Sequence, residues 1–343
     1  MAYPVTLLPG DGIGPEVVAA AILVLEATGV EFEWDEQEAG MTAFEKTGNP
    51  LPQAVLDSIE RTRLALKGPL TTPVGDGFRS VNVRLRQHFD TFANVRPAKS
   101  LPNTQGPFDG IDLILYRENT EGLYAGIEYF DERNQIADSI ARVTRRGSEK
   151  IIRFAFEDAG RRGRKRLTLV HKANILKKTS GMFLAIGHEI AQEYPAIEFD
   201  DRIVDNMAMQ LVIHPNHYDC IVTTNLFGDI LSDLISGLVG GLGVTGAANI
   251  GDDYAIFEAV HGSAPDIAGK GIANPTAIIQ SGAMLLRHIG EVAAADAVAN
   301  ALFAVYTEGT NLTADLGGPS STSEFASHLA DQVVEQRAAQ IAA

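Results

Sequence analysis

The sequence is short of positive charge and has a single cysteine. Among its 343 residues, Lys and Arg number 28 against 44 Asp and Glu, so the net charge is −16. A chain this acidic repels nucleic-acid backbones and anionic lipid surfaces, and we expect no nucleic-acid partner. Cys220 alone cannot form a disulfide framework or a cysteine-based zinc site, which favours a reducing compartment.

Long hydrophobic runs are also missing. The longest apolar run near the start, Val17–Leu25, is far shorter than the roughly 20 residues that a membrane span needs. The opening residues, MAYPVTLLPGDG, lack the basic region of a signal peptide and the Arg/Ser-rich character of a transit peptide. We therefore expect a cytoplasmic protein with no membrane partner.

Hydrophobic residues make up 45% of the chain, enough for one large domain or two moderate ones. Short runs rich in Val, Ile and Leu alternate with segments of helical period, which predicts an α/β fold with a largely parallel sheet. No repeat or low-complexity linker marks a domain boundary. The expected strands are Val5–Leu8, Leu113–Tyr116, Leu167–Val170 and Cys220–Thr223, and the expected helices are Pro15–Thr28, Asn174–Glu193 and Gly228–Val239.

The segment GDGIGPE, residues 10–16, combines glycines with a helix start. Glycines after a strand allow backbone N–H groups to approach a phosphate at a helix N-terminus. The third glycine of a dinucleotide fingerprint is absent, and Pro15 suits the first turn of a helix. A tight strand-to-helix turn without a ligand explains the segment equally well.

Cations gather between residues 80 and 117 of this acidic chain. Arg86, Arg96 and Arg117 are preceded by Ser80 and Asn82. Guanidinium groups bind carboxylates bidentately, so the set suits a small polycarboxylate substrate. A solvated basic face is the alternative.

Acidic residues form a second group. Asp229 and Asp233 are four residues apart, which places both carboxylates on one side of a helix, and Asp205 precedes them. An all-oxygen set suits Mg²⁺ or Mn²⁺ rather than zinc, although helix N-terminal acids are the alternative. Lys172 and Tyr124 are candidate proton carriers, and a surface position is the alternative for the lysine.

The loop HGSAPDIAGKGIANP, His261 to Pro275, is rich in small residues that let backbone approach a ligand. Asp266 could accept hydrogen bonds from a ribose hydroxyl and would repel a 2′-phosphate. A plain surface loop remains the alternative.

Taken in order, these segments resemble β-decarboxylating dehydrogenases, the family of isocitrate, homoisocitrate and 3-isopropylmalate dehydrogenases. Matching blocks run nearly end to end: LLPGDGIGPE, KGPLTTP, SVNVRLR, FANVRPAKS, RENTEGLYAGIE, HKANILK, HGSAPDIAGKGIANP and GTNLTADLGG. The resemblance implies an α/β fold with a mixed sheet, not a Rossmann fold. It implies a large domain from 1–98 and 241–343, a small domain from 99–240, and an arm at about 122–145 that locks two subunits into a homodimer.

The resemblance also implies roles for individual residues. Tyr124 would protonate the enol carbon, and Lys172 of the partner subunit would relay the hydroxyl proton. The substrate set is Ser80, Asn82, Arg86, Arg96, Arg117 and Asn174. The Mg²⁺ or Mn²⁺ set is Asp229, Asp233 and Asp205 of the partner subunit. The NAD set is Thr71, His261, Gly262, Ser263, Ala264, Asp266, Ile267 and Asn274.

Isopropylmalate enzymes typically have an acidic residue at Arg79 and a leucine pair at Asn82 and Val83. The polar residues here favour isocitrate, because an unpaired buried polar group costs about 1–3 kcal/mol. NADP-using bacterial members place lysine and tyrosine at Asp266 and Ile267, so we expect NAD. Homoisocitrate or 3-isopropylmalate dehydrogenase, and a non-catalytic regulatory subunit, remain alternatives; the retention of Tyr124 argues against the last.

Overall fold

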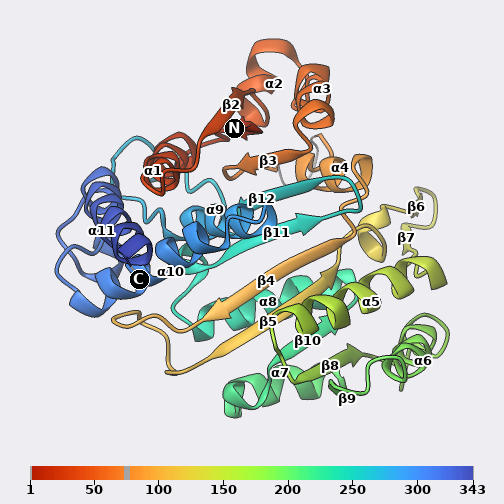
Figure 1. Cartoon of the computed structure of the whole chain (residues 1–343). Coiled ribbons are helices and arrows are strands. Elements are labelled where there is room, and N and C mark those ends of the chain that lie inside the picture. The colour runs from red at the N-terminus through yellow and green to blue at the C-terminus, as the bar shows by residue number, and fades with distance from the viewer. Residues whose placement is uncertain (1, 73–77, 343) are drawn as a thin grey trace.

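The computed structural model describes residues 2–72 and 78–342. One ten-stranded sheet runs through the molecule in the order β2-β1-β3-β12-β11-β4-β5-β10-β8-β9 (Figure 1). Its strands are β1 (Tyr3–Leu8), β2 (Phe32–Glu36), β3 (Leu64–Lys67), β4 (Ala93–Lys99), β5 (Asp112–Glu118), β8 (Arg166–His171), β9 (Glu198–Ile203), β10 (Cys220–Thr223), β11 (Gly246–Ile250) and β12 (Ala255–Ala259).

The sheet is mixed. Six of its strand pairs are parallel, whereas β11 is antiparallel to both β12 and β4, and β4 is antiparallel to β5. The expected α/β fold with a largely parallel sheet is therefore confirmed. Buried parallel strands read as continuous apolar runs, as in the LTLV of β8 and the CIVT of β10, because helices cover both of their faces.

Helices follow most strands and begin where the sequence allows. Pro15 lies in the first turn of its helix, and the hydroxyl of Thr144 accepts a hydrogen bond from the N–H of Gly147 to cap another. The helices are α1 (Gly14–Glu26), α2 (Met41–Thr47), α3 (Gln53–Thr62), α4 (Val81–His88), α5 (Arg145–Arg161), α6 (Thr179–Ala191), α7 (Val204–Ile213), α8 (Asn225–Leu238), α9 (Thr276–His288), α10 (Val292–Glu308) and α11 (Thr322–Ala342). The helix expected from Asn174 starts five residues later, because a turn carries the intervening residues.

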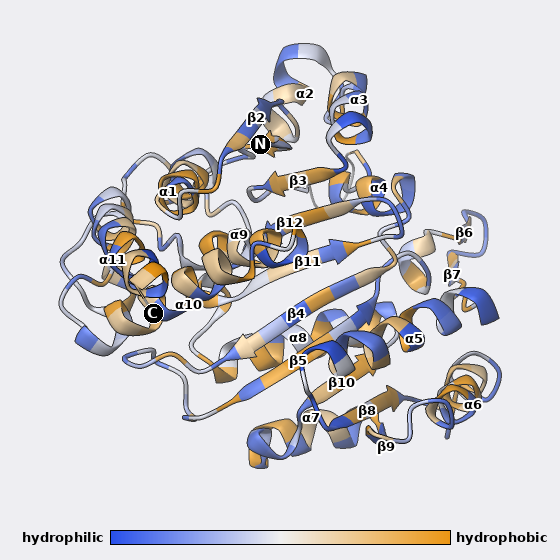
Figure 2. Cartoon of the chain, viewed as in Figure 1, coloured by the Kyte–Doolittle hydropathy of each residue, from blue (hydrophilic) through white to orange (hydrophobic). Residues whose placement is uncertain are grey.

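Apolar side chains form three clusters around the sheet. One extended cluster joins α1, α5, α6 and α9 to one face, which we call the α9 face. On the opposite face, the α8 face, α7 and α8 pack in one cluster and α3 and α4 in another. Figure 2 shows hydrophobic residues along β8, β10 and β12, while α5 is largely hydrophilic where it faces the viewer.

A small hairpin projects from the main body. Strands β6 (Glu128–Asp131) and β7 (Ile136–Ser139) form their own two-stranded sheet within the segment expected to be an arm (Figure 1). Large apolar side chains of this hairpin, Tyr129, Phe130 and Ile136, are exposed. The division into residues 1–98 with 241–343 and residues 99–240 remains a prediction.

Between residues 2 and 72 and between 78 and 342, no helix is both long enough and apolar enough to cross a membrane.

Candidate active site

Three arginines and two aspartates meet on the α8 face of the sheet. Arg96 lies on β4, Arg117 on its neighbour β5, and Arg86 on α4. Asp229 and Asp233 both lie on α8, past its first turn, so stabilisation of the helix dipole does not explain them. The structure thus brings together residues that are up to 147 positions apart, Arg86 and Asp233.

Opposite charges pair directly in this cluster. Arg117 forms an ion pair with Asp229 through Nη1 and binds the amide oxygen of Asn225 through Nη2 at 2.7 Å. Arg96 lies 3.1 Å from Asp233 and 3.7 Å from Asp229. The guanidiniums are buried, whereas the carboxylates are partly open, so a ligand that enters meets both charges at once.

The pKa values reflect this arrangement. Burial alone would raise the pKa of Asp229, but the charge of Arg117 and the hydroxyl of Tyr124 outweigh it and lower that pKa. Burial dominates at Asp233 and raises its pKa in spite of Arg96. Burial also lowers the pKa of Arg117 to about 10. Asp229 is therefore ionised at neutral pH, as a cation ligand must be.

Tyr124 joins the cluster, and Lys172 does not. The Tyr124 hydroxyl, on a short 3₁₀ turn after β5, donates to Asp229 Oδ2 at 2.7 Å. Burial and that bond raise the pKa of Tyr124, so it stays protonated at neutral pH. Lys172 follows β8 and donates instead to Asp205, in the first turn of α7. Asn174 is exposed in the same turn as Lys172.

His171 holds the start of this turn in place. Its Nε2 lies 2.9 Å from Asp201, and its Nδ1 accepts the N–H of Ala173 at 3.0 Å. The ring is buried, so both hydrogen bonds orient the backbone beside Lys172.

The sequence analysis did not predict a buried polar network that surrounds Glu258 and includes Arg86. Glu258 on β12 lies 2.7 Å from Lys67 and 3.0 Å from Arg86. Asn249 donates to Glu258 at 2.8 Å, and Asn94 donates to Asn249 at 2.9 Å. The charges of Lys67 and Arg86 hold the pKa of Glu258 well below its usual range against the effect of burial. A charged residue within an apolar strand, as in IFEAV and LALK, is the sequence signal that could have predicted Glu258 and Lys67.

Three buried polar atoms of predicted site residues lack a hydrogen-bond partner within the described residues: Asn82 Oδ1, Arg86 Nε and His261 Nε2. Such groups cost free energy unless they are satisfied, so each fits a group that binds there. Arg86 and Asn82 lie on α4 beside Ser80, which is its N-cap. The Arg86 Nε–H can donate to a carboxylate oxygen, and the Asn82 amide oxygen can accept from a hydroxyl of a ligand.

The loop after β12 contacts the loop after β3, which contains Thr71. The hydroxyls of Thr71 and Ser263 lie 2.7 Å apart. Asp266 and Gly262 are exposed, whereas Ala264 and Ile267 are partly buried. Burial lowers the pKa of His261, which favours a neutral imidazole.

Asn274, in contrast, already forms hydrogen bonds within the protein. Its side-chain amide donates to Asp315 at 3.0 Å, and its side-chain oxygen accepts the N–H of Thr276. Pro73, at the end of the KGPLTTP block, lies outside the described residues.

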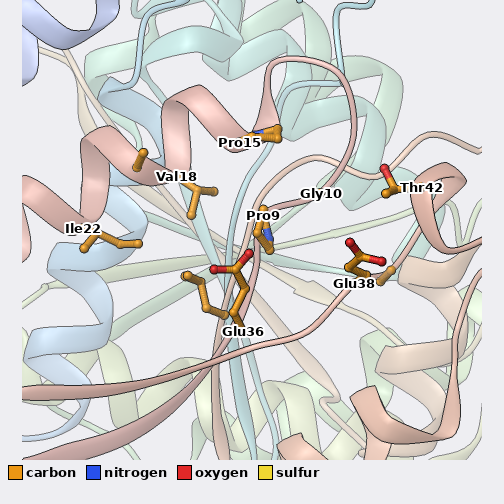
Figure 3. Close-up of a pocket in the computed structure, with 11 residues that line it drawn as sticks. Pro9, Gly10, Pro15, Val18, Ile22, Glu36, Glu38 and Thr42 are labelled. Atoms are coloured by element: carbon orange, nitrogen blue, oxygen red, sulfur yellow. The ribbon is translucent and has the colours of Figure 1, made fainter. Parts of the chain in front are cut away.

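Other parts of the protein pack against the GDGIGPE turn, residues 10–16. The N–H of Ile13 donates to the carbonyl of Ser263, and a Cβ at Gly12 would lie 2.0 Å from that oxygen. Glu36 and Glu38 line a hollow of about 280 Å³ next to this turn (Figure 3), and their charge disfavours phosphate. The tight-turn interpretation therefore accounts for these glycines.

Comparison with known proteins adds to this geometry. The family model described as isocitrate/isopropylmalate dehydrogenase matches residues 4–329. An isocitrate dehydrogenase structure from Methylococcus capsulatus is 60% identical, with a TM-score of 0.95 over 97% of this chain and 99% of that one.

Two curated relatives differ in cofactor. A mitochondrial NAD isocitrate dehydrogenase catalytic subunit of Arabidopsis thaliana is 46% identical over 96% of this chain and 88% of its own length. An NADP isocitrate dehydrogenase of Thermus thermophilus is 50% identical over 92% of this chain and 64% of its own length.

Proposed function

Because the chain belongs to the isocitrate/isopropylmalate dehydrogenase family, we propose that it oxidises isocitrate with NAD and releases carbon dioxide to give 2-oxoglutarate. The observation that supports this most is the cluster of buried arginines paired with Asp229 and Asp233, in which Tyr124 donates a hydrogen bond to Asp229. A substrate that carries carboxylates and a cation-chelating hydroxyl matches both halves of the set.

Each arginine would bind substrate carboxylate oxygens. Arg96 and Arg117 are already fixed by neighbours, since Arg96 Nε donates to Asn94 and Arg117 Nη2 to Asn225. Arg86 is held by Glu258, and its Nε has no hydrogen-bond partner among the residues that the structure describes. Such pre-positioning reduces the entropy lost on binding and favours one substrate orientation.

Asp229 and Asp233, with Asp205 of the partner subunit, would hold Mg²⁺ or Mn²⁺, and His261, Ser263 and Asp266 would contact NAD. When bound, the divalent cation would stabilise negative charge on the substrate oxygen, and NAD would accept the hydride. Lys172 of the partner subunit would take the hydroxyl proton at Nζ. Tyr124 would deliver a proton to the substrate carbon from which carbon dioxide has left.

Two subunits would share each site. Within the described residues no group of three His, Cys, Asp or Glu side chains could hold a metal ion, and Lys172 and Asp205 pair with each other apart from the cluster. Exposed apolar side chains on α7 and on the hairpin offer a surface for a second copy. Both observations support a homodimer with exchanged residues.

Specificity for isocitrate rests on the polar start of α4. Ser80 accepts a hydrogen bond from Thr72 at 3.3 Å, and Asn82 Oδ1 is buried without a partner among the described residues. An isopropyl group there would leave these polar atoms unpaired, which disfavours it. The cytoplasmic location remains a prediction from composition, and a mitochondrial relative exists.

The test is NADH formation by purified protein given isocitrate, homoisocitrate or 3-isopropylmalate in parallel, with and without Mg²⁺. We expect isocitrate to react fastest, a chelator to abolish the rate, and NADP to be used poorly. Faster turnover of homoisocitrate or 3-isopropylmalate would refute the specificity argument from Ser80 and Asn82. No turnover at all would favour the regulatory-subunit alternative, and equal efficiency with NADP would refute the argument from Asp266.

A further inference from the structure

His171 and Asp201 form a pair at the end of β8, next to Lys172. His171 is the last residue of β8, and its side chain is buried. Its Nε2 lies 2.9 Å from an oxygen of Asp201, on the neighbouring strand β9. The proposed reaction uses neither residue directly, so the pair is a buried imidazole and its carboxylate without an assigned role in catalysis.

The pair lies on the opposite face of the sheet from the arginine and aspartate cluster. Leu167 and Leu169 of β8 pack in the cluster of the α9 face, and His171 shares their side because successive side chains of a strand alternate. Lys172 comes one residue later and reaches Asp205 on α7, which packs on the α8 face. His171 therefore cannot touch a substrate held by the arginines, and any effect on catalysis must pass through its neighbours.

The hydrogen bonds of the ring define its tautomer. His171 Nδ1 lies 3.0 Å from the backbone nitrogen of Ala173, whose N–H can only donate. Nδ1 must therefore be unprotonated, which leaves the proton on Nε2, where it donates to Asp201. The carboxylate of Asp201 thus keeps Nδ1 available as an acceptor.

Both polar groups of one peptide bond are held beside Lys172. The N–H of Ala173 donates to the His171 ring. The carbonyl of Lys172 belongs to the same peptide bond and accepts the N–H groups of Ile175 and Leu176 at 3.0 and 2.8 Å. Because rotation of this peptide plane would break these bonds, they fix the direction in which the lysine side chain leaves the backbone.

A second histidine contacts the same carboxylate without holding the turn. His188 on α6 is exposed, and its Nε2 lies 3.5 Å from the other oxygen of Asp201. Within residues 2–72 and 78–342 it forms no hydrogen bond with the turn at 172–176. His188 therefore separates the effect of Asp201 from the effect of the contact between His171 and Ala173.

We propose that His171, oriented by Asp201, is a positioning residue for Lys172 and thereby sets the rate of proton transfer in the site of the partner subunit. This inference rests on the proposed function, in which Lys172 takes the hydroxyl proton. A proton relay must lie within hydrogen-bond reach of its target, and a displacement of about 1 Å can cost about 10²-fold in rate. The lysine stem is long and flexible, so a fixed peptide plane at its base supplies the precision that the side chain lacks.

The test compares His171→Asn with His171→Gln. In the asparagine variant the side-chain oxygen can take the position of Nδ1 and accept from Ala173, whereas glutamine can donate to Asp201 but offers no acceptor beside the turn. We expect kcat to fall by about 10²-fold in His171→Gln, with a much smaller change in the KM for isocitrate because the arginines are untouched. His171→Asn should keep most of kcat, and His188→Gln is the matched control that should keep all of it.

The thermal unfolding temperature checks that these variants fold. An equal loss of kcat in the asparagine and glutamine variants would overturn the proposal, as would near wild-type kcat in His171→Gln.

Mixed dimers identify the site that His171 serves. Coexpression of His171→Gln with Tyr124→Phe leaves one site with an intact Tyr124 and an intact Lys172 turn, so activity should rise above that of either homodimer. With Lys172→Met neither site regains an intact lysine, so activity should not rise. Recovery with Lys172→Met would contradict the proposal, because it would place the defect in the arginine cluster of the same chain.

A measurement without turnover tests the geometry by itself. In protein labelled with ¹⁵N-histidine, the imidazole signals that vanish in His171→Gln should show a proton on Nε2 and none on Nδ1. A proton on Nδ1 would refute the inference, because that ring could not accept from Ala173. Since this spectrum needs no substrate, its failure is distinct from failure of the proposed dehydrogenase activity.

Discussion

Tyr124 and Asp229 show how single residues set the chemistry of the cleft. Their hydrogen bond of 2.7 Å couples a raised phenol pKa to a lowered carboxyl pKa. Each group is thereby held in the protonation state that its proposed role requires, the acid protonated and the cation ligand ionised.

Replacement of Tyr124 by Phe should leave the fold intact and lower kcat by about 10² to 10⁴-fold, because it removes the proton donor. It also removes the hydrogen bond to Asp229. The same loss of kcat is expected for Lys172→Met. Initial-rate kinetics and the thermal unfolding temperature measure the two effects separately. Tyr129→Phe is the control, since that ring is exposed on the hairpin. Near wild-type kcat in Tyr124→Phe would contradict its role.

Glu258→Gln should lower the free energy of unfolding by about 3–5 kcal/mol, because it leaves the buried ammonium of Lys67 without its counter-charge. Chemical denaturation measures this value. Glu60→Gln, an exposed residue near His88, should change stability by less than about 0.5 kcal/mol.

The contribution of Glu258 to the free energy of unfolding should also depend on pH. Its pKa is lower in the folded than in the unfolded chain, so its stabilisation is complete above the unfolded value of about 4.3 and is lost as the pH falls toward the folded value. The stability difference between wild type and Glu258→Gln should therefore narrow below about pH 4.3. A constant difference over that range would contradict the assignment.

At the scale of elements, α7 has two functions in the proposed assembly. Its first turn contains Asp205, and its exposed side contains Met209, Val212 and Ile213. Residues three and four apart share one side of a helix, so these apolar side chains form a single face. A face of this kind at the surface is typical of a subunit contact.

The double variant Met209→Glu/Val212→Glu should be monomeric and inactive, because charge on this face opposes burial against a partner. Light scattering measures the mass in solution, and NADH formation measures activity. Val334→Glu on α11, another exposed apolar position, should remain dimeric. A dimeric double variant would rule out this face as the contact.

At the scale of the whole molecule, the ten-stranded sheet positions the arginines and aspartates on one chain but leaves Lys172 and Asp205 paired elsewhere. A shared site makes a specific prediction for mixed dimers. Tyr124→Phe and Lys172→Met, each nearly inactive alone, should together recover activity when expressed in one cell.

In a mixed dimer of these variants, one site contains both substitutions and the other contains neither. Random pairing should therefore restore about a quarter of wild-type activity, given a two-fold symmetric dimer with two sites. The kcat of separately purified homodimers is the control. If each site lay within one chain, the mixture would stay inactive, which would refute the exchange of residues between subunits.

The sequence alone was sufficient for the α/β fold with a largely parallel sheet and for the family. The structure brings together Arg86, Arg96, Arg117, Asp229 and Asp233, and their roles stay predictions. The fold and family predictions succeed because strand and helix periodicity, and the order of motifs, are features that can be read along the chain. Only the tertiary structure decided which distant residues pair. Lys67 reaches Glu258 because β3 lies beside β12, and Lys172 meets Asp205 because β8 lies beside β9. Sheet order depends on the packing of the whole chain, which no local pattern encodes.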